Sequence, residues 1–226
     1  SSCLLSNWSR VRVPQDPPMS LYGLILGICF VIGIEYFYKH NQIIPKKQEN
    51  FFIFSTLIFG LIGARIYGII ADWSYFSPNP IQILNLRGGG LGIFGGLIVA
   101  ITFILIFCLK NKINIFPVFN SLAPIIPLCQ SLGRWGNFFN HEIYSATGQP
   151  VWLYESIFML LVFFILQKTK IHQTGIYLIS YGIIRFFLEF IRTDTIQVFI
   201  LSLAQILSLL FIIFGSIIIK YENSRH

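Results

Sequence analysis

The sequence has few charged residues. Only 11% of its 226 residues are Asp, Glu, Lys or Arg, whereas 55% are hydrophobic and 23 are phenylalanine. A soluble domain carries roughly 25% charged residues, so this chain could not cover a water-facing surface. Its apolar runs are continuous and lack the alternation of a membrane β-strand. The composition therefore predicts an all-α integral membrane protein.

Common catalytic and metal-binding motifs are also missing. There is no Walker, HExxH or GxSxG motif, and the four cysteines form no CxxC pair. Cys29, Cys108 and Cys129 lie in apolar segments and are expected to act as small buried hydrophobic residues. We expect no metal and no cofactor. The sequence instead favours a transfer in which both substrates supply the reacting groups, while the protein holds a phosphate and helps to move a proton.

Seven apolar segments are long enough to cross a bilayer, for which a helix needs ~20 residues, in a range of roughly 17–25. The expected spans are residues 20–38, 51–70, 89–109, 116–132, 151–167, 174–190 and 199–219. The fourth contains Pro117, Pro124 and Pro127, so we expect it to be broken or partly re-entrant.

The N-terminal stretch is polar and rich in proline, with too few consecutive apolar residues for a signal-peptide core. We expect a lead-in at residues 1–19, a single seven-helix membrane domain at 20–220 and a tail at 221–226.

Lysine is absent from one side of this topology. All eight lysines fall in alternate loops and in the C-terminal tail: Lys39, Lys46, Lys47, Lys110, Lys112, Lys168, Lys170 and Lys220. Because basic residues gather in cytoplasmic loops, we expect the N-terminus outside and the C-terminus in the cytoplasm. The net charge of +7 then reflects topology, and no nucleic-acid partner is expected.

Polar residues are crowded in GRWGNFFNHE, residues 133–142. Arg134 cannot lose its proton and needs an anionic partner at a membrane boundary, which Glu142 or a phosphate could supply. Asn137 and Asn140 would share a face if the segment is helical. The alternative is an interfacial loop with solvated polar residues.

A second polar group follows in YGIIRFFLEFIR, residues 181–192. On one continuous helix, Tyr181, Arg185, Glu189 and Arg192 would fall within about 80° of one another. A charge in an apolar helix costs at least ~2.5–3 kcal/mol unless it is paired or hydrated. Either a structural ion pair or a polar wall of an outward-opening cavity would explain these residues.

Two further segments carry glycine or isolated charge. The run LRGGGLGIFGG at residues 86–96 suits close helix packing, or exposed amides that a lipid headgroup approaches. Arg65 in GARIYG is expected to face the helix bundle. Glu155 is explained as a charge near a helix N-terminus, and Tyr22 as an interfacial tyrosine.

The stretch GRWGNFFNHE resembles the signature of the prolipoprotein diacylglyceryl transferase family, G-R-x-G-N-F-hydrophobic-N-x-E followed by two residues and a glycine. Seven positions match: Gly133, Arg134, Gly136, Asn137, Phe138, Asn140 and Glu142. Ser145 stands in place of the final glycine. Tyr22–Leu24, GARIYG, the glycine run, LYES at 153–156 and residues 181–194 resemble further motifs, so the resemblance covers nearly the whole chain from about residue 20.

This resemblance implies seven spans and a defined reaction. The diacylglyceryl group of phosphatidylglycerol would pass to the lipobox cysteine of a prolipoprotein signal peptide, forming a thioether and releasing glycerol phosphate. The reaction would occur on the extra-cytoplasmic side of a bacterial-type inner membrane.

The resemblance also assigns site residues. Arg134 and Arg185 would hold the phosphate, and Glu142 and Glu189 would orient them. The remaining implied site residues are Asn137, Asn140, Tyr22, Tyr181, Arg65, Arg192, Gly95, Gly96 and Phe94.

The chain departs from the family at two places. Phe94 stands where members often carry histidine or tyrosine, and it cannot accept a proton. The loop from Ser145 to Gln149 is short where members often carry an insertion. Phe94 favours one alternative, a weakened homologue that binds phospholipid without transfer. Another alternative, a small-molecule transporter, would need polar residues that continue into the cytoplasmic half, and the sequence has few there.

Overall fold

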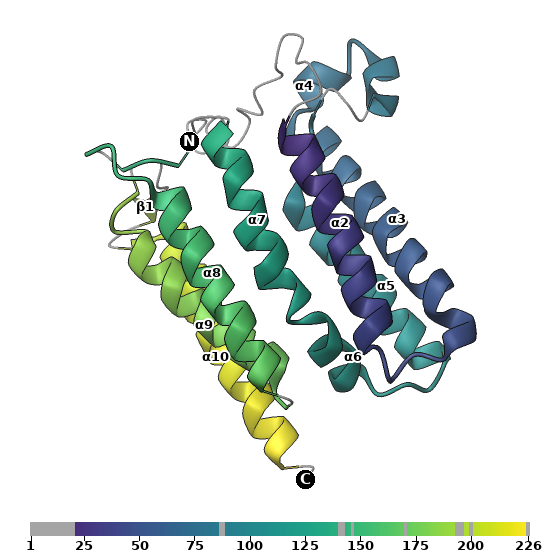
Figure 1. Cartoon of the computed structure of the whole chain (residues 1–226). Helices are drawn as coiled ribbons and strands as arrows, with labels where there is room; N and C mark the ends of the chain where they lie inside the picture. The colour runs from purple at the N-terminus through teal and green to yellow at the C-terminus, as the bar shows by residue number, and fades with distance from the viewer. Residues whose placement is uncertain are drawn as a thin grey trace. The chain divides into compact units, whose positions relative to one another are not determined.

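The described part of the chain forms helices, connecting loops and one short hairpin (Figure 1). The computed structural model describes residues 21–85, 89–139, 143–145, 147–169, 171–192, 197–198 and 201–224. The hairpin pairs β1 (Gln197–Val198) with β2 (Leu201–Ser202) in antiparallel register. Many large hydrophobic side chains are exposed along the helices. Such surfaces suit contact with lipid chains, as expected for a multi-pass membrane protein.

The described residues contain six candidate membrane spans. They are α2 (Leu21–His40), α3 (Lys46–Ala71), α5 (Ile93–Lys110), α6 with α7 (Ile115–Leu122 and Ile125–Phe139), α8 (Val151–Lys168) and α10 (Leu203–Asn223). The sixth expected span, residues 174–190, falls on α9 (Gln173–Leu188), which has 16 residues. That length is below the roughly 17–25 residues of a spanning helix, so α9 is not among the six.

The fourth expected span is broken, as its prolines predict. Helix α6 ends at Leu122 and α7 begins at Ile125, with Pro124 between them. Proline lacks an N–H and disfavours a helical residue before it, which explains the break. The expected end at residue 132 was too early, because α7 continues to Phe139. Arg134 and Asn137 therefore lie on a helix, and the alternative of an interfacial loop is wrong for residues 133–139.

The chain divides into two compact units. The first, residues 44–115 of the described chain, packs α3 against α5 and connects them through α4 (Trp73–Phe76) and η1 (Pro80–Leu84). A Cβ atom on Gly63 would lie 2.5 Å from the carbonyl oxygen of Gly95, and one on Gly95 would lie 2.4 Å from that of Gly63. The packing explanation of the glycine run is therefore confirmed at Gly95.

The second unit contains α2 and everything from residue 116 onwards. Helix α7 packs against α2 and α8, α8 packs against α9, and α9 packs against α10. Its apolar core includes Met159, Val162 and Leu166. This unit carries both buried arginine–carboxylate pairs described below.

A polar cluster ties three helices together at the lysine-rich end of the second unit. Asn120 of α6 donates to Glu222 of α10 at 2.7 Å, and Nδ1 of His172, which precedes α9, lies 2.6 Å from the same carboxylate. Asn120 also accepts a hydrogen bond from the backbone N–H of Thr174. No local sequence pattern predicts this cluster, because His172 and Asn120 are 50 and 102 residues from Glu222.

Candidate active site

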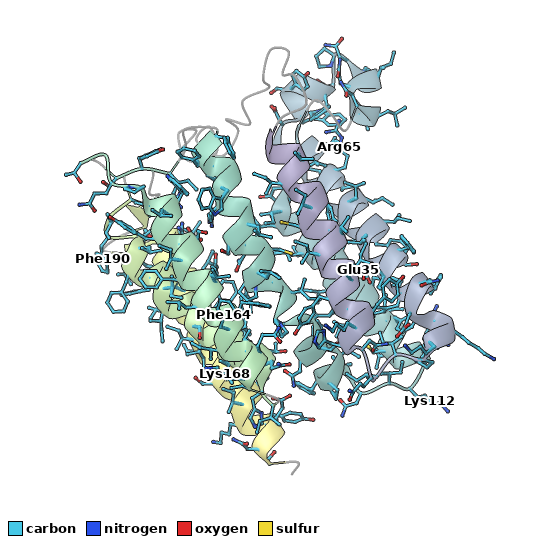
Figure 2. All side chains as sticks on the ribbon, viewed as in Figure 1. Glu35, Arg65, Lys112, Phe164, Lys168 and Phe190 are labelled. Atoms are coloured by element: carbon cyan, nitrogen blue, oxygen red, sulfur yellow. The ribbon has the colours of Figure 1, made fainter. Side chains whose placement is uncertain are left out.

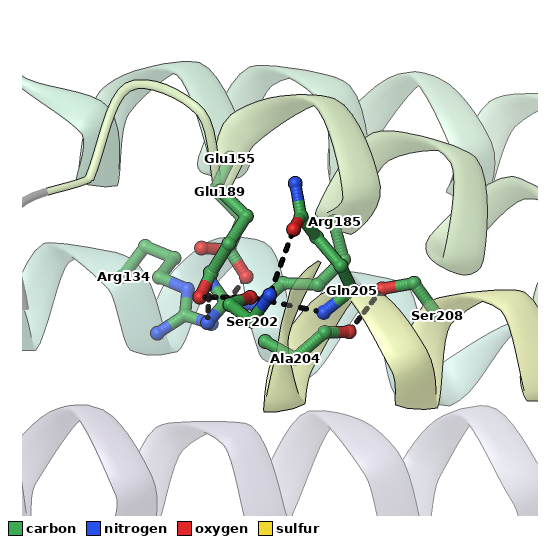
Figure 3. A network of polar contacts seen from close by, with 8 residues as sticks. All are labelled: Arg134, Glu155, Arg185, Glu189, Ser202, Ala204, Gln205 and Ser208. Atoms are coloured by element: carbon green, nitrogen blue, oxygen red, sulfur yellow. Dashed lines mark hydrogen bonds and ion pairs between the residues drawn. The ribbon is translucent and has the colours of Figure 1, made fainter. Parts of the chain in front are cut away.

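Two buried ion pairs lie close together in the second unit (Figure 3). Arg134 of α7 pairs with Glu155 of α8. Arg185 of α9 pairs with Glu189, four residues later, at 3.0 Å. The carboxylate side chains are only 1% and 4% exposed. Burial of a lone charge costs several kcal/mol, so each arginine offsets the cost of its carboxylate.

The N-terminus of α10 fixes the position of Glu189. Ser202 donates from Oγ to Oε1 of Glu189 at 2.8 Å. The same hydroxyl accepts from the backbone N–H of Gln205, whose side chain in turn accepts from the backbone N–H of Ser202. This reciprocal pair is a capping box. The carboxylate of Glu189 thus lies at the N-terminus of α10, where the helix dipole stabilises a negative charge.

The interface between α7 and α8 sets the position of Arg134. The hydroxyls of Ser131 and Ser156 lie 3.1 Å apart in this interface. The rings of Trp135 and Trp152 meet edge to face, with centroids 5.4 Å apart. These contacts fix the register of the two helices within one to three residues of Arg134 and Glu155, and so keep the two charges in contact.

Tyr181 joins the two ion pairs. Its hydroxyl is close enough to interact electrostatically with Glu155 and with Arg134, Arg185 and Arg192. Its ring stacks on Tyr177 with centroids 6.0 Å apart. The Tyr181 hydroxyl is therefore within electrostatic range of Arg134, Arg185 and Arg192.

The two arginines of this site retain unused hydrogen-bond donors. Nε of Arg134 and Nη1 of Arg185 are buried and have no hydrogen-bond partner among the described residues. Oε2 of Glu155 is also buried and has no hydrogen-bond partner among the described residues. Arg134 also donates weakly to Asn137 at 3.4 Å. Buried donors without partners are costly, and two guanidinium groups with free edges suit an oxyanion such as a phosphate.

Arg65, in the first unit, is bonded differently. Its five N–H donors make five hydrogen bonds to main-chain carbonyls, those of Gln82, Ile83, Asn85, Gly89 and Gly90. Its guanidinium carbon also lies 4.8 Å from the centre of the Phe76 ring. Arginine has five donors in total, so the loop saturates this side chain.

Glycine allows the loop to wrap around Arg65. Gly89 and Gly90 have φ angles of 81° and 71°, in the region that glycine adopts without strain. A Cβ on Gly90 would lie 3.0 Å from Nη1 of Arg65. The glycine run therefore serves the loop as well as the helix packing. Whether Arg65, Gly95 and Gly96 also contact substrate stays a prediction.

The helical stripe predicted for residues 181–192 is only partly correct. Helix α9 ends at Leu188 and Glu189 is its C-cap, so Arg192 is not on the helix. It lies in a turn and forms an isolated β-bridge with Ser145. The spacing argument assumed that the helix continued through residues 189–191. From this turn Arg192 is still within electrostatic range of the Tyr181 hydroxyl.

The remaining predicted site residues lie in the first unit or outside the described residues. Phe94 lies in the first turn of α5, is 43% exposed and approaches the ring of Tyr67 at 6.5 Å between centroids. Asn140, Glu142 and the side chain of Tyr22 lie outside the described residues. Their roles stay predictions. Among the described residues, no group of three or more His, Cys, Asp or Glu side chains could hold a metal ion.

Sequence reasoning missed Glu155 and Ser202. Glu155 was attributed to a helix N-terminus, although its charge within an apolar helix raised the same question of a partner as Arg185. The S-x-x-Q spacing of Ser202 and Gln205 before an apolar run is itself a helix-start pattern. What no pattern could give is that Ser202 also binds Glu189.

Comparison with known proteins agrees with these features. The family model described as prolipoprotein diacylglyceryl transferase matches residues 11–221. A phosphatidylglycerol–prolipoprotein diacylglyceryl transferase of Finegoldia magna is 34% identical over 89% of this chain and 91% of its own length. A protein of the same name from Streptococcus pneumoniae is 36% identical over 90% and 87%, respectively. The equivalent protein of Staphylococcus haemolyticus is 34% identical over 92% and 86%.

Proposed function

This chain belongs to the prolipoprotein diacylglyceryl transferase family, and from that premise we propose that it transfers the diacylglyceryl group of phosphatidylglycerol to a prolipoprotein cysteine. The observation that carries the proposal is the pair of partly buried arginines, Arg134 and Arg185, each with a buried donor that has no partner among the described residues. Their free edges match the charge and geometry of a phosphate.

The reaction requires charge stabilisation on the leaving group. A bond forms between the cysteine sulfur and the glyceryl carbon, and the bond from that carbon to the phosphate oxygen breaks. The thiol loses its proton, and glycerol phosphate leaves with the negative charge. Arginines fixed in a low-dielectric site stabilise such a charge without reorganisation. We assign this role to Arg134 and Arg185.

The other residues of the cluster have supporting roles. Glu155 and Glu189 hold the two guanidinium groups in place, and Ser202 holds Glu189 through its 2.8 Å hydrogen bond. Tyr181 and Arg192 extend the polar wall. Arg65 holds residues 82–85 and 89–90 through its five backbone contacts. Asn137, which lies 3.4 Å from Arg134, helps to order that side chain.

We further propose seven spans, in which α9 crosses the membrane in addition to the six candidate spans, with the N-terminus outside and the site facing the extra-cytoplasmic side. The segregation of all eight lysines supports this topology. Helix α9 is short for a span, yet it packs between α8 and α10. Its charged end would then lie at the outer boundary of the bilayer.

A reconstituted reaction tests the function. Purified protein is mixed with phosphatidylglycerol and a lipobox peptide, and the peptide mass is followed. The expected result is a thioether-linked diacylglyceryl peptide and an equal amount of glycerol phosphate. Absence of product in every detergent and lipid condition, with phosphatidylglycerol still bound, would instead establish the weakened homologue that Phe94 suggests.

A further inference from the structure

A groove lies at the lysine-rich end of the first unit, between α3 and α5. It has a volume of about 280 Å³. Figure 2 shows Lys112 at this end of the unit and Arg65 toward the opposite end. The groove therefore lies far along the helices from the loop that Arg65 organises, and it belongs to no site described above.

The rim of the groove is basic. Lys47 lies in the first turn of α3 and Lys110 in the last turn of α5, and both line the groove. Neither forms an ion pair with a described residue, and no lining residue is acidic. The rim therefore presents two unneutralised positive charges.

An unsatisfied polar atom adds a second, independent indication of a ligand. Oε1 of Gln48, which also lines the groove, is buried and has no hydrogen-bond partner among the described residues. The oxygen and nitrogen of a glutamine amide are assigned rather than observed. In the flipped orientation, the amide group would donate to an oxyanion between the two lysines. Pro45, the N-cap of α3, provides no side-chain cap, so the helix N-terminus adds to the positive potential.

The wall of the groove is apolar and aromatic. Phe103, Ile106 and Phe107 present one face of α5, and Phe51 of α3 completes the wall. The ring of Phe51 lies 6.4 Å from that of Phe103 and 6.3 Å from that of Phe107. These residues belong to candidate membrane spans. A ligand held here would contact hydrocarbon on one side and two ammonium groups on the other.

We propose that this groove binds an anionic glycerophospholipid, with the phosphate between Lys47 and Lys110 and the start of an acyl chain against the phenylalanines. Basic pockets between membrane helices bind acidic lipid headgroups in this way. The volume is slightly below the roughly 300–1,000 Å³ of small-molecule sites, which suits one end of a lipid. The assignment of the groove to the cytoplasmic leaflet rests on the proposed topology. The identification of the residues that line the groove does not depend on that topology.

Phosphatidic acid is the probe, because it carries a phosphate and is not the proposed substrate. Binding to the delipidated full-length protein is measured by native mass spectrometry. We expect the double variant Lys47→Ala/Lys110→Ala to bind phosphatidic acid roughly 30-fold more weakly than wild type, about fivefold for each lysine. The matched control, Lys39→Ala/Lys168→Ala, removes two lysines of the second unit and should change affinity less than threefold, a factor that corresponds to about 0.6 kcal/mol.

Three further arms make the test decisive. Gln48→Leu keeps the volume of the side chain and should weaken binding about fivefold, so the test does not depend on the double variant folding. Phosphatidylcholine, whose headgroup is neutral overall, should bind weakly. Glycerol 3-phosphate at millimolar concentration should not displace the lipid. Equal loss in both double variants, no loss in either, or displacement by glycerol 3-phosphate overturns the proposal. No arm measures transfer, so the result is independent of the enzymatic proposal.

Discussion

The arginines of the two units differ in what satisfies them. In the first unit, five main-chain carbonyls occupy all five donors of Arg65. In the second, Arg134 and Arg185 each face one carboxylate and retain a buried donor without a partner among the described residues. A saturated guanidinium stabilises a loop, whereas an unsaturated one can still bind. Bonding of the donors, rather than burial, separates the two roles.

The sharpest test of this difference is removal of the unsaturated arginines. Arg134→Gln or Arg185→Gln should lower the transfer rate by a factor of roughly 10²–10³, the usual effect of deleting a group that stabilises charge in the transition state. Formation of the lipidated peptide measures it. A lysine at either position keeps the positive charge but lacks the planar guanidinium group that binds a phosphate through two hydrogen bonds. The Arg→Lys variants should therefore be faster than the Gln variants but slower than wild type. Wild-type transfer rates in both Gln variants would show that Arg134 and Arg185 do not hold the phosphate.

The saturated arginine should respond in stability. Arg65→Lys keeps a charge but leaves several carbonyls unpaired, each costing about 1–3 kcal/mol if it stays buried. We therefore expect unfolding to be easier by about 3 kcal/mol, seen as a lower melting temperature and faster proteolysis at residues 80–90. The transfer rate per folded molecule should stay within about threefold of wild type, because a factor of three is only about 0.6 kcal/mol. A collapse of the rate without loss of stability would place Arg65 with the substrate instead.

A smaller effect is expected when only the charge of a partner is removed. Glu155→Gln keeps the shape of the side chain but leaves Arg134 without its counter-ion, so we expect about a tenfold slower transfer, equivalent to ~1.4 kcal/mol. The exposed carboxylate of Glu35 provides the control, and Glu35→Gln should have no effect. If the two variants behave alike in the peptide assay, Glu155 does not position Arg134.

The smallest change concerns the cap of α10. Ser202→Ala removes the N-cap hydroxyl and the hydrogen bond to Glu189, which should cost about 1 kcal/mol of stability. The transfer rate should fall by only a few-fold, because Arg185 still holds Glu189. Ser208→Ala removes a buried hydroxyl of the same helix that binds only Ala204. An equal loss of rate in both variants would mean that the cap has no special link to the site.

Local patterns predicted local contacts. The i, i+4 spacing of Arg185 and Glu189 gave their ion pair, and three prolines gave the break before α7. The spacing failed at Arg192, because the helix ends at Leu188. It also could not pair Arg134 with Glu155, which are 21 residues apart on different helices. Such a pair depends on how the two helices pack, and the hydrophobic periodicity of each helix does not predict which residues meet across the interface.

Arg65 shows the same limit for main-chain partners. Its acceptors are carbonyls 17 to 25 residues later, and every residue type carries a carbonyl. The resemblance placed Arg65 in the site with the other arginines. Only the fold of residues 80–85 and 89–90 reveals that its donors are already used.

Binding of phosphatidylglycerol without an acceptor peptide tests the central claim most directly. The affinity is measured for the wild-type site, Arg134→Gln and Arg65→Lys, all in the Lys47→Ala/Lys110→Ala background so that the groove of the first unit does not contribute. Diacylglycerol, which lacks the phosphate, is the control ligand. We predict at least tenfold weaker phosphatidylglycerol binding for Arg134→Gln alone, with diacylglycerol binding unchanged. Equal phosphatidylglycerol affinity in all three proteins would contradict the account.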